Sequence, residues 1–134
     1  MQLVILGTGN VATVLGKAFQ EKGHSIKAVW GRDLAAAKEL AQSLDTVGFD
    51  AVADIPMDAD AYMVAVADPA IAELAAHLRV GEQLIFHCGG AVSKEALKSC
   101  SSHYGVLWPV HIIRKGQSLP DHFPVVLDGN DGYA

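Results

Sequence analysis

Apolar residues follow two different periods along this chain, and the pattern predicts most of its secondary structure. Residues 3–6 form a continuous apolar run of strand length, and residues 10–22 carry apolar side chains at helical spacing. A second strand over 26–30 and a second amphipathic helix over 34–44 follow, with Asp33 placed to cap that helix. Strands that alternate with helices in this way are typical of a parallel sheet.

The middle of the chain is less regular, but the alternation continues. Residues 46–49 predict a short third strand and residues 51–55 a single helical turn, and the apolar run 61–67 predicts a strand buried on both faces. A helix should follow from Asp68, an N-cap candidate before Pro69. The remaining predicted elements are a strand over 84–87, a helix over 94–100 capped by Ser93, a strand over 106–108, a loop over 112–124 and a last strand over 125–127.

Together these elements predict a single α/β domain over residues 1–134. The fold class is a doubly wound, mostly parallel sheet of the Rossmann type, with strand order 3-2-1-4-5-6 and an extra edge strand. The length of 134 residues suits one domain, and a hydrophobic content of 51% argues against a disordered chain.

A glycine loop follows the first strand and carries the main functional prediction. Its six residues match the G-x-G-x-x-G/A pattern of dinucleotide-binding loops, with a strand before and a helix after. Gly7 permits the sharp turn, Gly9 lets a pyrophosphate approach the backbone, and Ala12 lets the helix pack close to the sheet. We expect all six to contribute to a cofactor site: Gly7, Thr8, Gly9, Asn10, Val11 and Ala12.

The end of the second strand indicates which dinucleotide binds. NAD-binding domains place a carboxylate there, about 20 residues after the loop, to hold the ribose hydroxyls. Here Gly31 and Arg32 follow Trp30, and a guanidinium can clamp a 2′-phosphate that a carboxylate would repel. We therefore expect NADP(H), with Arg32 as the selecting residue. The alternative for Arg32 is a solvated loop charge.

Six further residues should lie near the nicotinamide, because ligands of such sheets bind beyond the carboxyl ends of the strands. The two glycines among them could equally form an ordinary turn, and the aspartate is more often a helix cap than a catalytic acid. The six are Val66, Ala67, Asp68, His87, Gly89 and Gly90.

Side chains that could carry chemistry are few. His87 is the weak catalytic candidate, as a proton donor, although a histidine at the end of a buried strand is more often satisfied by backbone groups. Cys88 lacks an evident base that would make it a nucleophile. We expect no metal site, since His87, Cys88 and His111 have no recognised ligand spacing.

Charge and composition restrict the partners. A formal net charge of −5 argues against nucleic acid and anionic membranes, and no apolar run is long enough to span a bilayer. No basic segment of a signal peptide begins the chain, and Cys88 and Cys100 have no C-x-x-C spacing. We expect a cytoplasmic protein that acts on a small-molecule substrate.

Several motifs occur in one order: the glycine loop, residues 30–32, 64–68, 87–90 and 104–110. Together they resemble a bacterial family of NADP oxidoreductases, similar to pyrroline-5-carboxylate reductase, ketopantoate reductase and the 6-phosphogluconate dehydrogenase superfamily, over essentially the whole chain. The resemblance implies hydride transfer between NADP(H) and a small C=O or C=N substrate. It also implies a homodimer formed by a second, helical domain, which residues 1–134 do not contain.

Two alternatives to an oxidoreductase stay open. One is a non-catalytic NADP(H)-binding or redox-sensing module, which is favoured if the natural chain ends at Ala134. The second loop also lacks the hydroxyl residue common in the family, so no substrate contact from such a hydroxyl is expected. The other is a methyltransferase with an adenosyl cofactor, which is disfavoured because it also needs an acid at the end of the second strand.

Overall fold

The computed structural model describes residues 1–89, 92–109 and 125–130. Within them, seven strands form one sheet in the order β3-β2-β1-β4-β5-β6-β7. Strands β1 to β6 are parallel, and β7 pairs antiparallel with β6 as the edge strand. The predicted doubly wound Rossmann sheet, its order and its extra strand are confirmed. The strands are β1 (Gln2–Leu6), β2 (Ser25–Trp30), β3 (Gly48–Phe49), β4 (Ala61–Val64), β5 (Gly81–His87), β6 (Ser101–Pro109) and β7 (Val125–Gly129).

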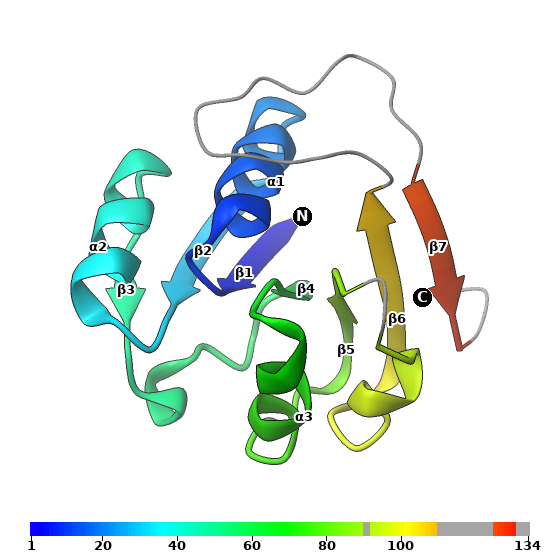
Figure 1. Ribbon diagram of the computed structural model, residues 1–134. Helices are drawn as coiled ribbons and strands as arrows, with labels where there is room; N and C mark the ends of the chain where they lie inside the picture. Colours follow the sequence, from blue (N-terminus) through cyan, green and yellow to red (C-terminus); the bar gives the residue numbers. More distant parts are fainter. Residues whose placement is uncertain (90–91, 110–124, 131–134) are drawn as a thin grey trace.

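Helices cover both faces of the sheet (Figure 1). One face is covered by α1 (Asn10–Glu21) and α2 (Leu34–Ser43), the other by α3 (Asp68–Ala75) and the 3-10 turn η2 (Lys94–Leu97). A second 3-10 turn, η1 (Val52–Asp54), joins β3 to β4.

Strand β1 shows why this arrangement needs a continuous apolar run. Leu3 and Ile5 pack in the cluster that contains the α1 and α2 side chains, whereas Val4 and Leu6 pack in the cluster of α3. All four side chains are fully buried. Because neighbouring residues of a strand face opposite sides, a strand between two helical layers must be apolar at every position.

The predictions for β4 and α3 require correction. The strand ends at Val64 instead of residue 67, although Ala65 still donates its N–H to Leu6 O at 2.7 Å. Ala67, not Asp68, is the N-cap of α3, and the Asp68 carboxylate makes no capping bond. Asp68 is already inside the first helical turn, so its carboxylate points instead toward Gly89, where an added Cβ would meet it.

The prediction for residues 94–108 also changes. The predicted helix is only the short turn η2, which Ser93 caps by accepting from Glu95 N at 3.1 Å, as expected. Strand β6 begins at Ser101, earlier than predicted, because Val80 donates to Cys100 O at 2.7 Å and draws the chain alongside β5. The predicted loop over 112–124 lies outside the described residues.

Candidate functional site

The first glycine loop, residues 7–12, leads from β1 into α1 and is tightly built at its start. Gly7 has a φ of +132°, a conformation that L side chains rarely adopt, and it donates its N–H to Trp30 O at 2.8 Å. A Cβ on Gly7 would overlap the carbonyl of Ala65, with the carbonyl carbon 2.7 Å away. Only glycine therefore fits between β2 and the end of β4.

The second glycine of this loop has the opposite environment. Gly9 is the N-cap of α1, and apart from its chain neighbours no atom of the described residues lies within 4 Å of the position its Cβ would take. The first turn of α1 has no side-chain cap and no acidic residue. The first N–H groups of a helix lack helical partners and carry partial positive charge, so this end of α1 is suited to an anion.

Close packing behind the loop depends on two small residues, Ala12 and Gly16. Ala12 is fully buried against the sheet, as predicted, while Val11 packs at the border of the same cluster. Gly16, which the motif does not include, is equally important, since a Cβ there would lie 2.6 Å from Ile5 Cδ1. The pair Ala12 and Gly16, four residues apart on one helix face, is the sequence signal for this close approach.

Thr8 and Gly31 meet across the loop. A Cβ on Gly31 would lie 2.6 Å from Thr8 Cγ2, and Gly31 donates its N–H to Phe49 O at 3.0 Å. Gly31 is buried, so its first effect is to let the loop and the end of β2 pack together. Asn10, in contrast, is exposed at the first turn of α1.

Arg32 lies at the rim of a cavity of about 190 Å³. Its guanidinium Nη2 is 3.2 Å from Glu73 Oε2, and both side chains are mainly exposed. The cavity lies between the end of β2, residue 66 and α3, at the carboxyl edge of the sheet. Its lining residues are Trp30, Arg32, Val52, Val66, Ala70, Glu73, Leu74 and His77.

The segment after β4 and the segment after β5 lie side by side. Cys88 donates its N–H to Val64 O at 3.1 Å, and a Cβ on Gly89 would lie 2.5 Å from Asp68 Oδ1. Val66 is half-buried, and Ala67 and Asp68 are exposed at this edge. The predicted residues Val66 to Asp68 and Gly89 are therefore brought together, whereas Gly90 lies outside the described residues.

His87 has no exposed surface, and both its ring nitrogens have backbone partners. Gly89 donates its N–H to Nδ1 at 3.1 Å, so Nδ1 is the acceptor and Nε2 carries the proton that it shares with Ser93 O at 3.0 Å. This histidine therefore holds Gly89 and Ser93, which are described residues of the second glycine loop (residues 88–93), against the end of β5. The geometry favours a structural histidine over a proton donor.

Cys88 is also unsuited to nucleophilic chemistry. Burial raises the pKa of the Cys88 thiol from 9.0 to about 12, so the thiol stays protonated near neutral pH. Among the described residues, no three His, Cys, Asp or Glu side chains gather closely enough to hold a metal ion. His111 lies outside that part of the chain.

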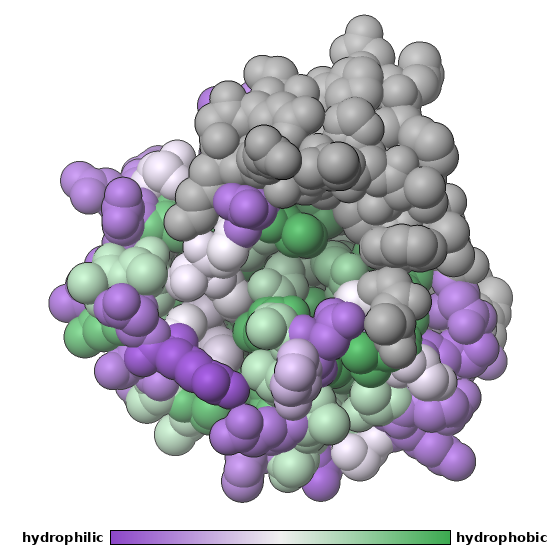
Figure 2. Space-filling model, in the orientation of Figure 1, coloured by the Kyte–Doolittle hydropathy of each residue, from purple (hydrophilic) through white to green (hydrophobic). Residues whose placement is uncertain are grey.

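The rim of the carboxyl edge is polar and its centre is not. Figure 2 shows a pale to green centre between α1 and α3, bordered by hydrophilic side chains.

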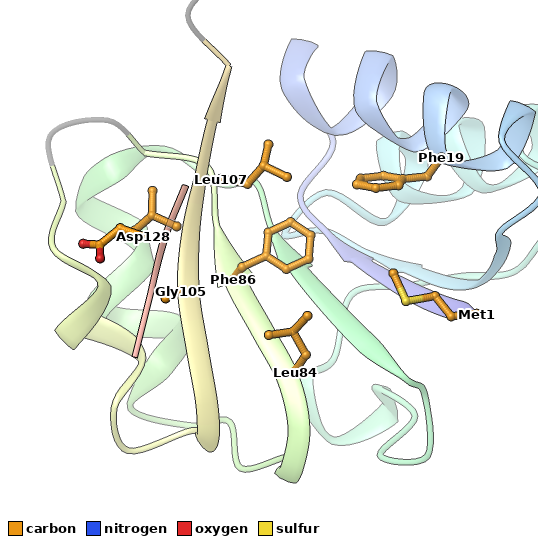
Figure 3. A pocket seen from close by; sticks show the side chains of 9 residues that line it. Met1, Phe19, Leu84, Phe86, Gly105, Leu107 and Asp128 are labelled. Atoms are coloured by element: carbon orange, nitrogen blue, oxygen red, sulfur yellow. The ribbon is translucent and has the colours of Figure 1, made fainter. Parts of the chain in front are cut away.

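A second cavity, of about 180 Å³, lies elsewhere, on the flank of β5 and β6 beside α1 (Figure 3). Met1, Phe19, Leu84, Phe86 and Leu107 point into it, so it is apolar and separate from the first glycine loop.

In the described part of the chain, no helix combines the length and the hydropathy needed to cross a membrane. A family model described as "NADP oxidoreductase coenzyme F420-dependent" matches residues 2–85. No curated protein matches the chain.

Solved structures share the fold. A Bacteroides fragilis protein provisionally named an NADP oxidoreductase is 28% identical, with a TM-score of 0.90 over 98% of this chain and 52% of its own. For 1-pyrroline-5-carboxylate reductase from Streptococcus pyogenes the identity is 19% and the TM-score is 0.69, over 81% of this chain and 42% of its own. Prephenate dehydrogenase from Aquifex aeolicus, in complex with hydroxyphenyl propionate and NAD+, is 15% identical. Its TM-score is 0.72, over 95% of this chain and 50% of its own. The chain spans about half the length of these proteins.

Proposed function

The chain belongs to the family described as NADP oxidoreductase, coenzyme F420-dependent, and from this premise we propose that it binds NADP(H) for hydride transfer. The substrate is a small molecule with a C=O or C=N bond. Residues 1–134 act as the cofactor-binding domain of this reaction. The nicotinamide supplies the hydride, and the protein supplies binding, orientation and exclusion of water.

The contrast between Gly7 and Gly9 supports the proposal most directly. Gly7 leaves no room for a side chain, while Gly9 opens onto free space at the N-terminus of a helix with no acid in its first turn. A pyrophosphate needs both features, because it must approach the backbone closely and accept hydrogen bonds from the helix. The residues present therefore fit a dinucleotide.

Arg32 supports the phosphorylated cofactor. It follows β2, the strand whose end holds the ribose of a bound dinucleotide in such folds, and no carboxylate takes that place. In this proposal the 2′-phosphate lies at Arg32, the pyrophosphate at the first glycine loop, and the nicotinamide beside Val66 to Asp68 and Gly89. The NAD+ in the prephenate dehydrogenase structure makes NADH the necessary competitor in any test.

The first test is isothermal calorimetry with NADPH, NADH and S-adenosylmethionine. We expect NADPH to bind best and Arg32→Ala to weaken it by about 1.5–3 kcal/mol, with little change for NADH. Lys98→Ala, which removes an exposed cation elsewhere, is the matched control. Equal losses for both nicotinamide cofactors would contradict the role of Arg32, and binding of S-adenosylmethionine alone would favour a methyltransferase.

The second test measures turnover by the complete natural gene product. Imines, keto acids and oxidised coenzyme F420 are screened as hydride acceptors from NADPH, the last because the family description names this coenzyme. Reduction of any member supports the oxidoreductase. NADPH binding without turnover of either class would favour the redox-sensing alternative.

A further inference from the structure

The ion pair between Arg32 and Glu73 connects the two elements that border the 190 Å³ cavity. Arg32 follows β2, and Glu73 projects from α3, 41 positions later in the chain. The atoms Nη2 and Oε2 are 3.2 Å apart, and the side chains are 68% and 70% exposed. Within the described residues, Glu73 is the carboxylate paired with Arg32.

This pairing matters because one guanidinium has a limited set of donors. A phosphate that takes the fork of Arg32 must displace the Glu73 carboxylate or lie beside it, and two anions close together repel each other. An exposed ion pair is weak, whereas a guanidinium–phosphate contact is stronger. The phosphate therefore displaces the Glu73 carboxylate from Arg32, although this competition lowers the net affinity of Arg32 for the phosphate.

We propose that Glu73 is a specificity-determining residue that holds Arg32 in the absence of a 2′-phosphate and releases it when the phosphate binds. The pair thus sets the size of the preference for NADP(H) over NAD(H). NADH has no 2′-phosphate, so Arg32 stays with Glu73 in its complex. This inference rests on the proposed NADP(H) binding.

The test compares Glu73→Gln with the wild type in calorimetric titrations of NADPH and NADH at fixed ionic strength. Glu73 is exposed on α3, and glutamine keeps its size and helix propensity, so the fold should persist. We expect NADPH to bind about three- to fivefold more tightly and NADH to change less than about twofold. The gain should shrink in high salt, since exposed charges are screened.

Two further variants make the result specific. Glu82→Gln changes the net charge equally, at the amino end of β5, and should leave both affinities unchanged. In the Arg32→Ala background, Glu73→Gln should raise the NADPH affinity much less, because the guanidinium that Glu73 holds is absent.

Each outcome decides a point. An unchanged ratio of NADPH to NADH affinity in Glu73→Gln, with normal wild-type binding of NADPH, refutes this inference alone. Weaker NADH binding in that variant also refutes it and makes Glu73 a direct ribose ligand. A wild-type protein that binds no NADPH refutes the proposed function, and this inference with it.

Discussion

The two glycine loops lie at the same edge of the sheet but are held in place differently. In the first loop the restraint is the backbone itself, since Gly7 has a positive φ and its neighbour is the Ala65 carbonyl. In the second loop the restraint comes from side chains: His87 bonds Gly89 and Ser93, and the Asp68 carboxylate lies against Gly89.

This difference separates two kinds of glycine. A glycine that faces backbone cannot be replaced without moving strands, whereas one that faces the end of an exposed side chain can be accommodated. The first loop should therefore be intolerant of substitution at one position, and the second should respond mainly to the loss of its side-chain contacts. Four experiments test the comparison.

Gly7→Ala should have the largest effect. The added methyl group meets the Ala65 carbonyl, and the positive φ is strained for alanine, so we expect a loss of about 3 kcal/mol or more in unfolding free energy. Urea denaturation measures it. Gly9→Ala is the control: with open space around it, stability should fall by less than about 1 kcal/mol, while NADPH binding weakens. Similar stability losses for both variants would show that the loop is not restrained at Gly7.

His87→Leu should rank second. The substitution leaves the buried Gly89 N–H without its partner, at a cost of about 1–3 kcal/mol, whereas the Ser93 carbonyl still accepts from Ala96 N. His87→Gln, whose amide can donate and accept, should recover part of it. Ring-nitrogen NMR of the wild type should show the neutral Nε2-protonated tautomer. A loss of turnover without a loss of stability would restore the catalytic role of His87.

Gly89→Ala should cost only about 1 kcal/mol. The nearest atom to the new methyl group is Asp68 Oδ1 at 2.5 Å, the end of an exposed side chain that can rotate away, followed by Ile71 Cδ1 at 3.1 Å. Adding Asp68→Ala should therefore recover most of the loss, which a double-mutant cycle measures. Additive losses would place the obstruction in the backbone and remove the distinction between the loops.

The smallest effect concerns pH. Burial raises the pKa of Cys88 from 9.0 to about 12, so above pH 9 the unfolded thiol ionises while the folded one does not. The unfolded state then binds fewer protons, and stability should fall as the pH rises from about 9 toward 12. Urea unfolding of Cys88→Ala should show a shallower decline than the wild type. Identical slopes would mean that the thiol is accessible to solvent.

The sequence predicts the first loop well because its glycine spacing is a local signal, although the Ala65 carbonyl that confines Gly7 comes from a distant segment. The spacing of Gly7, Gly9 and Ala12 predicts the turn after β1, the room above the Gly9 backbone and the close packing of α1 on the sheet. The strand order follows from the alternation of strands and helices. The family resemblance drawn from the motifs is confirmed by the family match. The roles of Arg32 and of the nicotinamide-side residues stay predictions.

Other features depend on contacts between distant segments, which the hydrophobic periodicity of the sequence does not predict. The partner of Arg32 comes from α3, and the end of β4 depends on where α3 turns away. Gly16 could have been found from its spacing to Ala12. The start of β6 could not, because Ser101 to His103 are polar and join the strand through pairing with β5.

Strand β1 gives the site a further property, which concerns hydrogen exchange. It is paired on both edges and covered on both faces, and Leu3 to Leu6 have no exposed surface. Amides in such a strand exchange with solvent only when the whole domain opens. The first glycine loop continues directly from β1, so the loop is formed only in the folded domain, and a partly unfolded domain cannot bind the dinucleotide there. A dinucleotide that binds the loop should therefore slow exchange across the entire central sheet, far from any atom that it touches.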